Sequence, residues 1–137
     1  PKGAKVDASG CPIVEKNAEE LEAERMKVEP VYFDINKATF SAQEKAKIDK
    51  LVNLLKENSN YSVKVSGYTD ADGSDVYNMN LSKNRAASVV RSIVAGKIKS
   101  KRITSQKGFG EANPASSNDT DQGKALNRRV EFEVTKK

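Results

Sequence analysis

The sequence contains no histidine and a single cysteine among its 137 residues. Without histidine, Ser-His-Asp and Cys-His catalysis are excluded, and the commonest transition-metal ligand is missing. We therefore predict no metal site, no cofactor and no catalytic residue of these kinds. Cys11 has no possible partner within the chain, so an internal disulfide is excluded. We expect a free thiol, or a bridge to a cysteine outside this sequence.

Long apolar runs are also absent. No stretch approaches the roughly 18 consecutive apolar residues that a transmembrane helix needs. The first four residues lack the apolar core of a signal peptide, so we expect any export signal to lie outside this sequence. With 36% hydrophobic and 31% charged residues, the composition is typical of a soluble protein with one core.

The net charge is positive, from 24 Lys plus Arg against 19 Asp plus Glu. Such an excess can indicate an acidic polymer as partner. On one predicted helix, however, basic and acidic residues alternate as on an ordinary solvated face, and we interpret the charge as not concentrated. These residues are Glu44, Lys45, Lys47, Asp49 and Lys50. No RNP motif, zinc-finger spacing or basic heptad is present, so we expect no nucleic-acid partner.

Residues 1–30 are predicted to be a linker that contains a short acidic helix. Residues 1–12 show little periodicity and are typical of a linker or an ordered turn. Residues 16–27 carry four glutamates and few large apolar residues, which indicates a mostly exposed helix. Pro30 disfavours helix at the residue before it, so the domain is expected to span residues 31–137.

Within this domain the hydrophobic pattern alternates between strand and helix periodicity. Helices are predicted after Ser41 and from Ser74, ending at Asn58 and Gly96 respectively. The segment 110–122 is predicted to be a polar loop. Strands are predicted at 31–35, 61–68, 103–109 and 129–134. The order strand, helix, strand, helix, strand, strand predicts an α/β (α+β) sandwich with a mixed sheet covered by helices.

Three aspartates lie close together at positions 70, 72 and 75. A calcium loop of the EF-hand type starting at Asp70 would need glycine and glutamate where Asp75 and Leu81 stand, so no metal site is predicted. A glycosidase would need two carboxyl groups across a sugar cleft. Asp70 and Asp72 share one polar turn, where turn formation and helix capping already explain them. A hydrolase that uses Asp70 and Asp72 remains an alternative.

Residues 67–89 carry the most specific pattern in the chain. They match G-[HY]-T-D-x-x-G-x-x-x-x-N-x-x-L-S-x-x-R-A-x-x-V, which resembles the signature of the OmpA/Pal/MotB family. Every fixed position is met. These positions are Gly67, Thr69, Asp70, Gly73, Asn78, Leu81, Ser82, Arg85, Ala86 and Val89. Residues 31–36 and 127–131 resemble the flanks of the family domain, so the resemblance covers most of the chain.

The resemblance implies a non-catalytic domain that binds peptidoglycan through the diaminopimelate of its stem peptide. A free diaminopimelate end carries an ammonium and a carboxylate on one carbon, so a receptor needs one anion and one forked cation. Asp70 and Arg85 supply this pair. Arginine can hold a carboxylate through two parallel N–H donors, each contributing roughly 1.5–3 kcal/mol. A plain salt bridge between the two residues is the alternative.

By position in the pattern, Thr69, Asn78 and Leu81 are expected in the same pocket, with Asn36 and Arg128 contributed by the flanks. Asparagine also caps turns and helices, and Arg128 could pair with an acidic neighbour, so these alternatives stay open. Tyr68 stands where the family commonly has histidine, and we expect binding to survive this difference.

The resemblance also implies a location and a parent protein. It is closest to the periplasmic domain of an OmpA-type outer-membrane protein, and residues 7–12 are similar to the spacer that follows the barrel in such proteins. We therefore expect a domain on the periplasmic face of the outer membrane of a Gram-negative bacterium, anchoring that membrane to the cell wall. A domain that mainly docks other proteins through its exposed helices is a further alternative.

Overall fold

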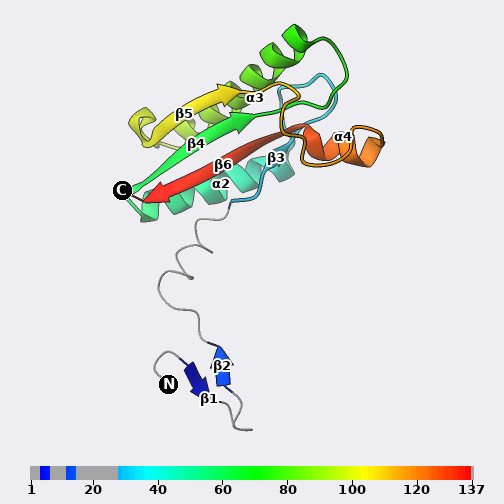
Figure 1. The fold of residues 1–137 in the computed structure, drawn as a ribbon. Helices are drawn as coiled ribbons and strands as arrows, with labels where there is room; N and C mark the ends of the chain where they lie inside the picture. Colours follow the sequence, from blue (N-terminus) through cyan, green and yellow to red (C-terminus); the bar gives the residue numbers. More distant parts are fainter. Residues whose placement is uncertain (1–3, 7–11, 15–27, 137) are drawn as a thin grey trace.

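A four-stranded mixed sheet organises the main part of the molecule, in the order β3-β6-β4-β5 (Figure 1). The computed structural model describes residues 4–6, 12–14 and 28–136. β6 runs antiparallel to β3 and β4, whereas β4 and β5 are parallel. The bounds of the strands are β3 (Val31–Tyr32), β4 (Tyr61–Gly67), β5 (Ile103–Gly108) and β6 (Arg129–Lys136).

Two long helices cover one face of this sheet, and its other face is open (Figure 1). They are α2 (Ala42–Glu57) and α3 (Asp75–Ala95). A short 3-10 helix, η1 (Ser100–Arg102), precedes β5, and a third helix, α4 (Asp121–Asn127), precedes β6. The mixed sheet covered by helices was predicted from the sequence, and this fold class is confirmed. α4 is an additional element at the end of the segment predicted to be a polar loop.

The core lies between the sheet and the two long helices. Alternate side chains of β4, Tyr61, Val63 and Val65, point to this core and are buried, and Lys64 on the other face is exposed. This is the period of two that a strand with one covered face requires. The helical side of the core is formed by Ile48, Leu51, Val52, Leu55, Ala86, Val89 and Ile93.

The start of α2 shows how local capping also positions the first strand. Ser41 caps the helix as predicted, because its Oγ accepts a hydrogen bond from the backbone N–H of Glu44 at 3.3 Å. The carboxylate of Glu44 in turn accepts the backbone N–H of Tyr32 at 2.8 Å and a hydrogen bond from Lys47 at 3.0 Å. One glutamate therefore ties β3 to α2.

Two short strands lie outside the four-stranded sheet. β1 (Ala4–Val6) and β2 (Pro12–Val14) pair antiparallel, with Ala4 opposite Val14. The sequence predicted a linker or an ordered turn here. The acidic helix predicted at 16–27 lies outside the described residues, as does Cys11. Among the described residues, no helix is both long and apolar enough to cross a membrane.

Arg102 closes the end of α2 and was not singled out by the sequence. Its guanidinium donates to the backbone carbonyls of Leu55, Asn58 and Tyr61, each at 2.7 Å. These groups include carbonyls of the last turn of a helix, which have no partner within the helix itself. Arg102 therefore fastens the α2–β4 connection to η1.

Replacing Arg102 with alanine is expected to lower the free energy of unfolding by about 2 kcal/mol, since charge-assisted bonds to three carbonyls are lost together. Urea titration followed by circular dichroism measures this. The matched control is Lys101→Ala, an exposed neighbour on the same short helix, which should change stability little. Equal midpoints for the two variants would contradict the role given to Arg102.

Candidate functional site

The turn that follows β4 presents Thr69 and Asp70 at one end of the sheet. The backbone N–H of Thr69 donates to the carbonyl of Gly110 at 2.8 Å, and its hydroxyl donates to the carbonyl of Asp70 at 2.8 Å. Gly73 has a φ of 95°, a conformation that glycine adopts without strain. Both polar groups of Thr69 are thus used to shape the turn, and the residue is buried.

Asp70 is held by Arg128 from the other end of the domain. Its side chain is only 8% exposed, and its Oδ2 lies 3.2 Å from Nη1 of Arg128. The other oxygen accepts the backbone N–H of Asp72 at 3.1 Å. Arg128 also donates through Nε to the carbonyl of Phe33 at 2.9 Å. Among the described residues Asp70 therefore forms its ion pair with Arg128, which is one of the two roles left open for Arg128, and not with Arg85.

Arg85 lies on α3 and is completely buried. Its guanidinium donates to three backbone carbonyls, those of Asp34, Lys37 and Tyr68, at 3.0, 2.8 and 3.0 Å. The same group lies 5.2 Å from the ring centre of Phe33. Three of its five N–H donors are thus committed to the backbone and two are not.

The pKa of the Arg85 guanidinium depends on its burial and on the neighbouring charges. Burial lowers the pKa of the Arg85 guanidinium to about 10, while the negative charge of Asp70 opposes this shift and the positive charge of Arg128 adds to it. Arg85 therefore stays positive at neutral pH. The side chain of Tyr77 also raises this pKa. The result is one carboxylate associated with two cations at the end of β4.

The remaining predicted residues are placed around this group. Asn36 is exposed, has a φ of 60°, and accepts a hydrogen bond from the Tyr77 hydroxyl at 3.0 Å. Asn78 is buried, with its amide nitrogen 3.5 Å from a carboxylate oxygen of Glu111. Leu81 is half-buried on the next turn of α3. Asn36 thus joins the β3–α2 connection to α3, and Asn78 joins α3 to the segment after β5.

Asn127, a buried asparagine to which the sequence analysis gave no role, supports the turn that carries Asp70 through Asn118. The amide group of Asn127 bonds both backbone groups of Ser116, at 2.8 and 2.9 Å, and donates to Oδ1 of Asn118 at 2.9 Å. The same Oδ1 accepts the backbone N–H of Ala71 at 3.1 Å. The long polar segment is therefore fixed to the turn that carries Asp70. In the sequence, Asn127 was marked only as the first residue of the flank 127–131 that resembles the family.

Tyr68, which stands where the family commonly has histidine, is accommodated by packing. Its ring stacks on Phe109 with centroids 5.5 Å apart, and the guanidinium of Arg129 lies 4.0 Å from the ring centre. Burial raises the pKa of the Tyr68 hydroxyl, and the nearby charge of Glu131 raises it further. Tyr68 is therefore part of the packing that supports the turn.

The aspartates of the turn do not form a facing pair of free carboxyl groups. Asp70 pairs with Arg128, and Asp72, which is 61% exposed, lies 3.3 Å from Nζ of Lys124. Within residues 4–6, 12–14 and 28–136, no group of three or more acidic, cysteine or histidine side chains could hold a metal ion.

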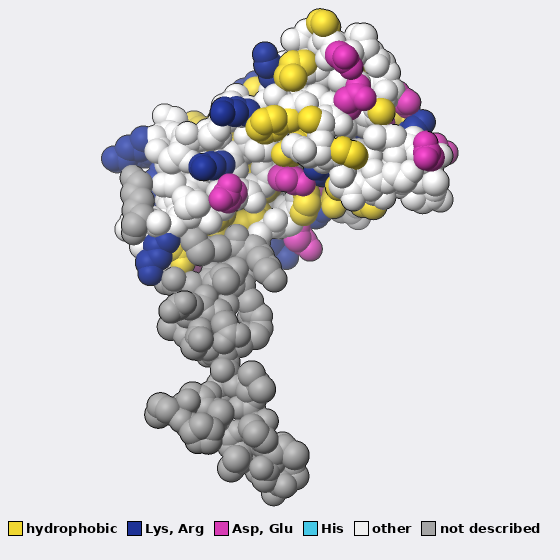
Figure 2. Space-filling model, viewed as in Figure 1, with side chains coloured by type: hydrophobic (Ala, Val, Ile, Leu, Met, Phe, Trp, Pro, Cys, Tyr) yellow, Lys and Arg dark blue, Asp and Glu magenta, His cyan; other side chains and the backbone are white. Residues whose placement is uncertain are grey.

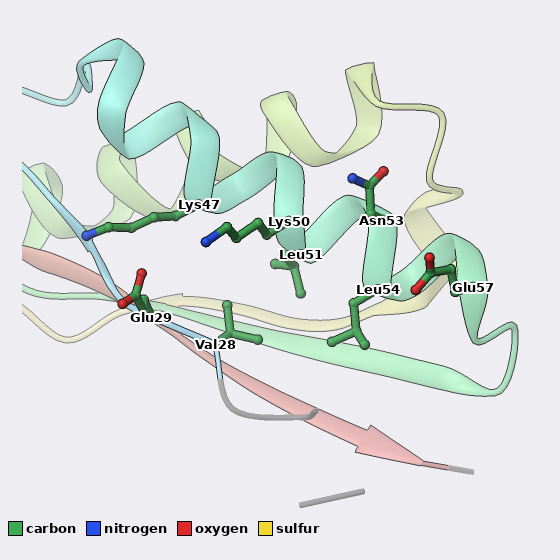
Figure 3. A pocket seen from close by; sticks show the side chains of 8 residues that line it. All are labelled: Val28, Glu29, Lys47, Lys50, Leu51, Asn53, Leu54 and Glu57. Atoms are coloured by element: carbon green, nitrogen blue, oxygen red, sulfur yellow. The ribbon is translucent and has the colours of Figure 1, made fainter. Parts of the chain in front are cut away.

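Two hollows differ in their relation to this site. One of about 260 Å³ opens beside Arg128, between the β3–α2 connection and α4. A larger one of about 410 Å³ lies along the outer side of α2, next to residues 28 and 29 (Figure 3). None of the predicted ligand-binding residues lines the larger hollow. Of the predicted residues, Arg128 lines the smaller hollow, and the candidate site at the end of β4 rests on the hydrogen bonds and charges of its residues and not on a cavity volume.

Comparison with known proteins agrees with this architecture. Outer membrane porin F of Pseudomonas aeruginosa is 36% identical over 98% of this chain, which spans 36% of that protein. Outer membrane protein A of Escherichia fergusonii is 41% identical over 76% of this chain, which spans 47% of it. The crystal structure of the peptidoglycan-associated lipoprotein from Burkholderia pseudomallei has the same fold, with a TM-score of 0.73 and 24% identity, covering 77% of this chain and 89% of that one.

The family assignment agrees with the residues that build the site. The match to the OmpA family runs from residue 32 to residue 128. The matched segment therefore includes the β3–α2 connection, the turn with Asp70 and the buried Arg85, and it ends at Arg128. On this match, and on its likeness to these outer membrane proteins, the chain belongs to the OmpA family.

Proposed function

We propose that this chain binds peptidoglycan non-covalently and thereby anchors its parent protein to the cell wall. The observation that carries the proposal is the nearly buried carboxylate of Asp70, which lies beside the positive charges of Arg85 and Arg128. The Burkholderia protein of the same fold is named as peptidoglycan-associated. At 24% identity that likeness concerns the fold, so the proposal rests on the site itself.

The ligand group that fits this site is the free end of diaminopimelate. Asp70 would accept its ammonium, and the two cations would receive its carboxylate. One oxygen of Asp70 lies 3.2 Å from Nη1 of Arg128, which is long for a charge-assisted bond. We propose that the ligand inserts here. Asp70 then exchanges Arg128 for the ammonium, and Arg128 turns to the carboxylate.

Arg85 would take part through its two uncommitted N–H donors. Because the group is completely buried, the ligand reaches it only if the surrounding loop shifts. The hydrogen bond between Asn36 and Tyr77 joins the two elements on either side, so we propose that it opens on binding.

The other residues of the proposed site would hold the ligand or shape its surroundings. Thr69 sets the backbone of the turn, Asn78 and Asn36 offer amide groups to the stem peptide, and Leu81 offers an apolar contact. We propose that residues 31–137 form the binding domain and residues 1–30 a linker. The parent protein would be anchored in the outer membrane of a Gram-negative bacterium, with this domain on the periplasmic face.

The proposal is tested by removing the charge of Asp70 while keeping its shape. Asp70→Asn should weaken diaminopimelate binding and co-sedimentation with purified sacculi by about 10- to 100-fold, since one charge-assisted contact of about 1.5–3 kcal/mol is lost. Asp72→Asn is the matched control, because Asp72 is largely exposed in the same turn. Calorimetry measures the affinity for diaminopimelate, and co-sedimentation measures binding to sacculi.

If Asp70→Asn and wild-type protein bind both ligands equally, the proposed site is wrong. The thermal midpoint of each variant is measured in parallel, so that loss of folding is recognised. The same samples address the hydrolase alternative. Release of soluble muropeptides by the wild-type protein, lost in Asp72→Asn, would favour hydrolysis over binding.

A further inference from the structure

The positive charge of this chain comes from one segment. Residues 76–110 contain eight Lys and Arg and no Asp or Glu. The rest of the chain then holds 16 basic and 19 acidic residues, so the whole net positive charge arises within these 35 residues. The even mixture of charges on α2 led to the interpretation that charge is not concentrated. Counted by segment, the charge is strongly concentrated.

Two of the eight cations are used inside the fold, and six are free to act on the surroundings. Arg85 and Arg102 donate to backbone carbonyls. The other six are exposed, and among the described residues none of them forms an ion pair. We name these six the basic edge. They are Lys83, Arg91, Lys97, Lys99, Lys101 and Lys107.

The basic edge follows α3, the connection after it and the outer strand β5. In Figure 2, Lys and Arg side chains line the edge of the molecule that β5 and η1 form in Figure 1. β5 is an outer strand of the sheet, so this edge is open along its length. From Lys83 to its end at Ala95, α3 advances on the order of 20 Å. The edge is thus longer than the contact of a single small ligand.

The basic edge begins next to the proposed binding site. Gly108 of β5 packs directly against the backbone of Lys83, where an added Cβ would meet the backbone nitrogen at 2.5 Å. Two residues further on, the carbonyl of Gly110 accepts the backbone N–H of Thr69. One end of the basic edge therefore lies next to the turn that carries Asp70.

We infer that the basic edge is a second contact for peptidoglycan, in which exposed cations attract the free carboxylates of stem peptides next to the one held at Asp70. This inference rests on the proposed function. Free carboxylates recur along the wall because each stem peptide carries them. Unpaired, solvated cations spread over three elements suit such a repeated anion better than one fixed ligand, since they attract through charge with little demand on geometry.

A lipid bilayer fits the same edge less well. Surfaces that dock on bilayers combine basic residues with large apolar side chains that enter the interface. Beside the cations on α3, the described residues expose two separate large apolar side chains, Val94 at 41% and Met79 at 37%. We therefore propose that the basic edge contacts the cell wall. Binding to a bilayer is one of the outcomes that the test below distinguishes.

The test compares two triple variants of the intact chain. One removes three charges from the basic edge, and the control removes three exposed lysines from α2 and β4. The edge variant is Lys97→Gln, Lys99→Gln, Lys101→Gln, and the control variant is Lys50→Gln, Lys56→Gln, Lys64→Gln. Both change the net charge equally. Binding to purified sacculi is measured at low and high salt, and binding to diaminopimelate by calorimetry.

We expect the edge variant to bind sacculi about tenfold more weakly than the control at low salt, because several small surface contributions add. The difference should vanish near 1 M salt, where the Debye length falls to about 3 Å. Affinity for free diaminopimelate should be unchanged, since that ligand does not reach the edge. Equal sacculus binding by the two variants at low salt overturns the inference.

Two further outcomes separate this inference from the proposed function. If Asp70→Asn binds normally while the edge variant loses sacculus binding, the site at Asp70 is wrong and the basic edge stands. If the edge variant loses binding only to vesicles of phosphatidylglycerol and phosphatidylethanolamine in equal parts, and not to sacculi, the edge contacts a bilayer and the inference is wrong.

Discussion

Replacing Arg85 with alanine is expected to lower the free energy of unfolding by about 3–5 kcal/mol, the range found when one member of a buried charged network is removed. Arg85 is completely buried, and its side chain joins the carbonyls of Asp34, Lys37 and Tyr68. The alanine variant would leave these acceptors without their donors, a cavity where the side chain stood, and Asp70 with one cation fewer nearby.

Urea titration measures this loss, with Arg91→Ala as the matched control. Arg91 lies on the same helix but is exposed, so its replacement should change stability by about 0.5 kcal/mol or less. A loss below about 1 kcal/mol for Arg85→Ala would contradict the bonding described for this side chain. Arg85→Lys keeps the charge but cannot reach three carbonyls at once, and it should fall between the two.

This expectation affects how ligand binding is tested. A variant that removes Arg85 disturbs the β3–α2 connection and the end of β4 together, so its loss of sacculus binding would not distinguish a ligand contact from a structural one. Asp70→Asn is the sharper probe because it keeps the size and shape of the side chain. A double variant of Asp70 and Arg85 would combine the two effects.

The second large effect is expected for Gly67→Ala. Gly67 ends β4, and an added Cβ would collide with the backbone carbonyl of Ser82 on α3. Backbone atoms cannot move aside as a flexible side chain can, so helix and strand would have to separate. We expect a loss of about 3 kcal/mol, at the upper end of the usual cost of overpacking.

The control for Gly67 is its neighbour on the open face of the sheet. Ser66→Ala changes a half-buried residue that does not face α3, and it should alter the unfolding free energy little. Thermal unfolding of the wild-type protein, Gly67→Ala and Ser66→Ala is compared by circular dichroism. A Gly67→Ala protein that melts together with Ser66→Ala would show that α3 does not approach the strand as closely as described.

The family signature combines two kinds of constraint, positions that pack the core and positions that shape the turn. Gly67 allows the close approach of α3, while Ala86 and Val89 are core residues. Asp70 and Thr69 shape the turn. A single sequence cannot separate packing positions from ligand positions, so Asp70 and Arg85 were predicted to act as one clamp. In the structure Arg85 donates to backbone carbonyls and Asp70 pairs with the side chain of Arg128, and their joint action on a ligand stays a prediction.

Local patterns predicted most of the fold because the helices and strands have clear periodicity and caps. α4 was missed because it is short and polar and contains Gly123, so it shows no apolar stripe. The roles of Arg102 and Asn127 depend on carbonyls and amides distant in sequence, which no local pattern records. The basic edge is detected in the sequence only when charges are counted over the segment 76–110 as a whole.

The hydrogen bond between Arg128 and Phe33 joins residues 95 positions apart, and Asp70 meets Arg128 across 58 positions. Contacts of such long range form late in folding, because the loops between them must close first. During synthesis on the ribosome, Asp70 is added 58 residues before Arg128. A ribosome-bound or truncated chain that ends before residue 128 therefore has the recognisable signature without the ion pair between Asp70 and Arg128. Conversely, any ligand that engages both residues selects the fully folded domain and stabilises it by mass action.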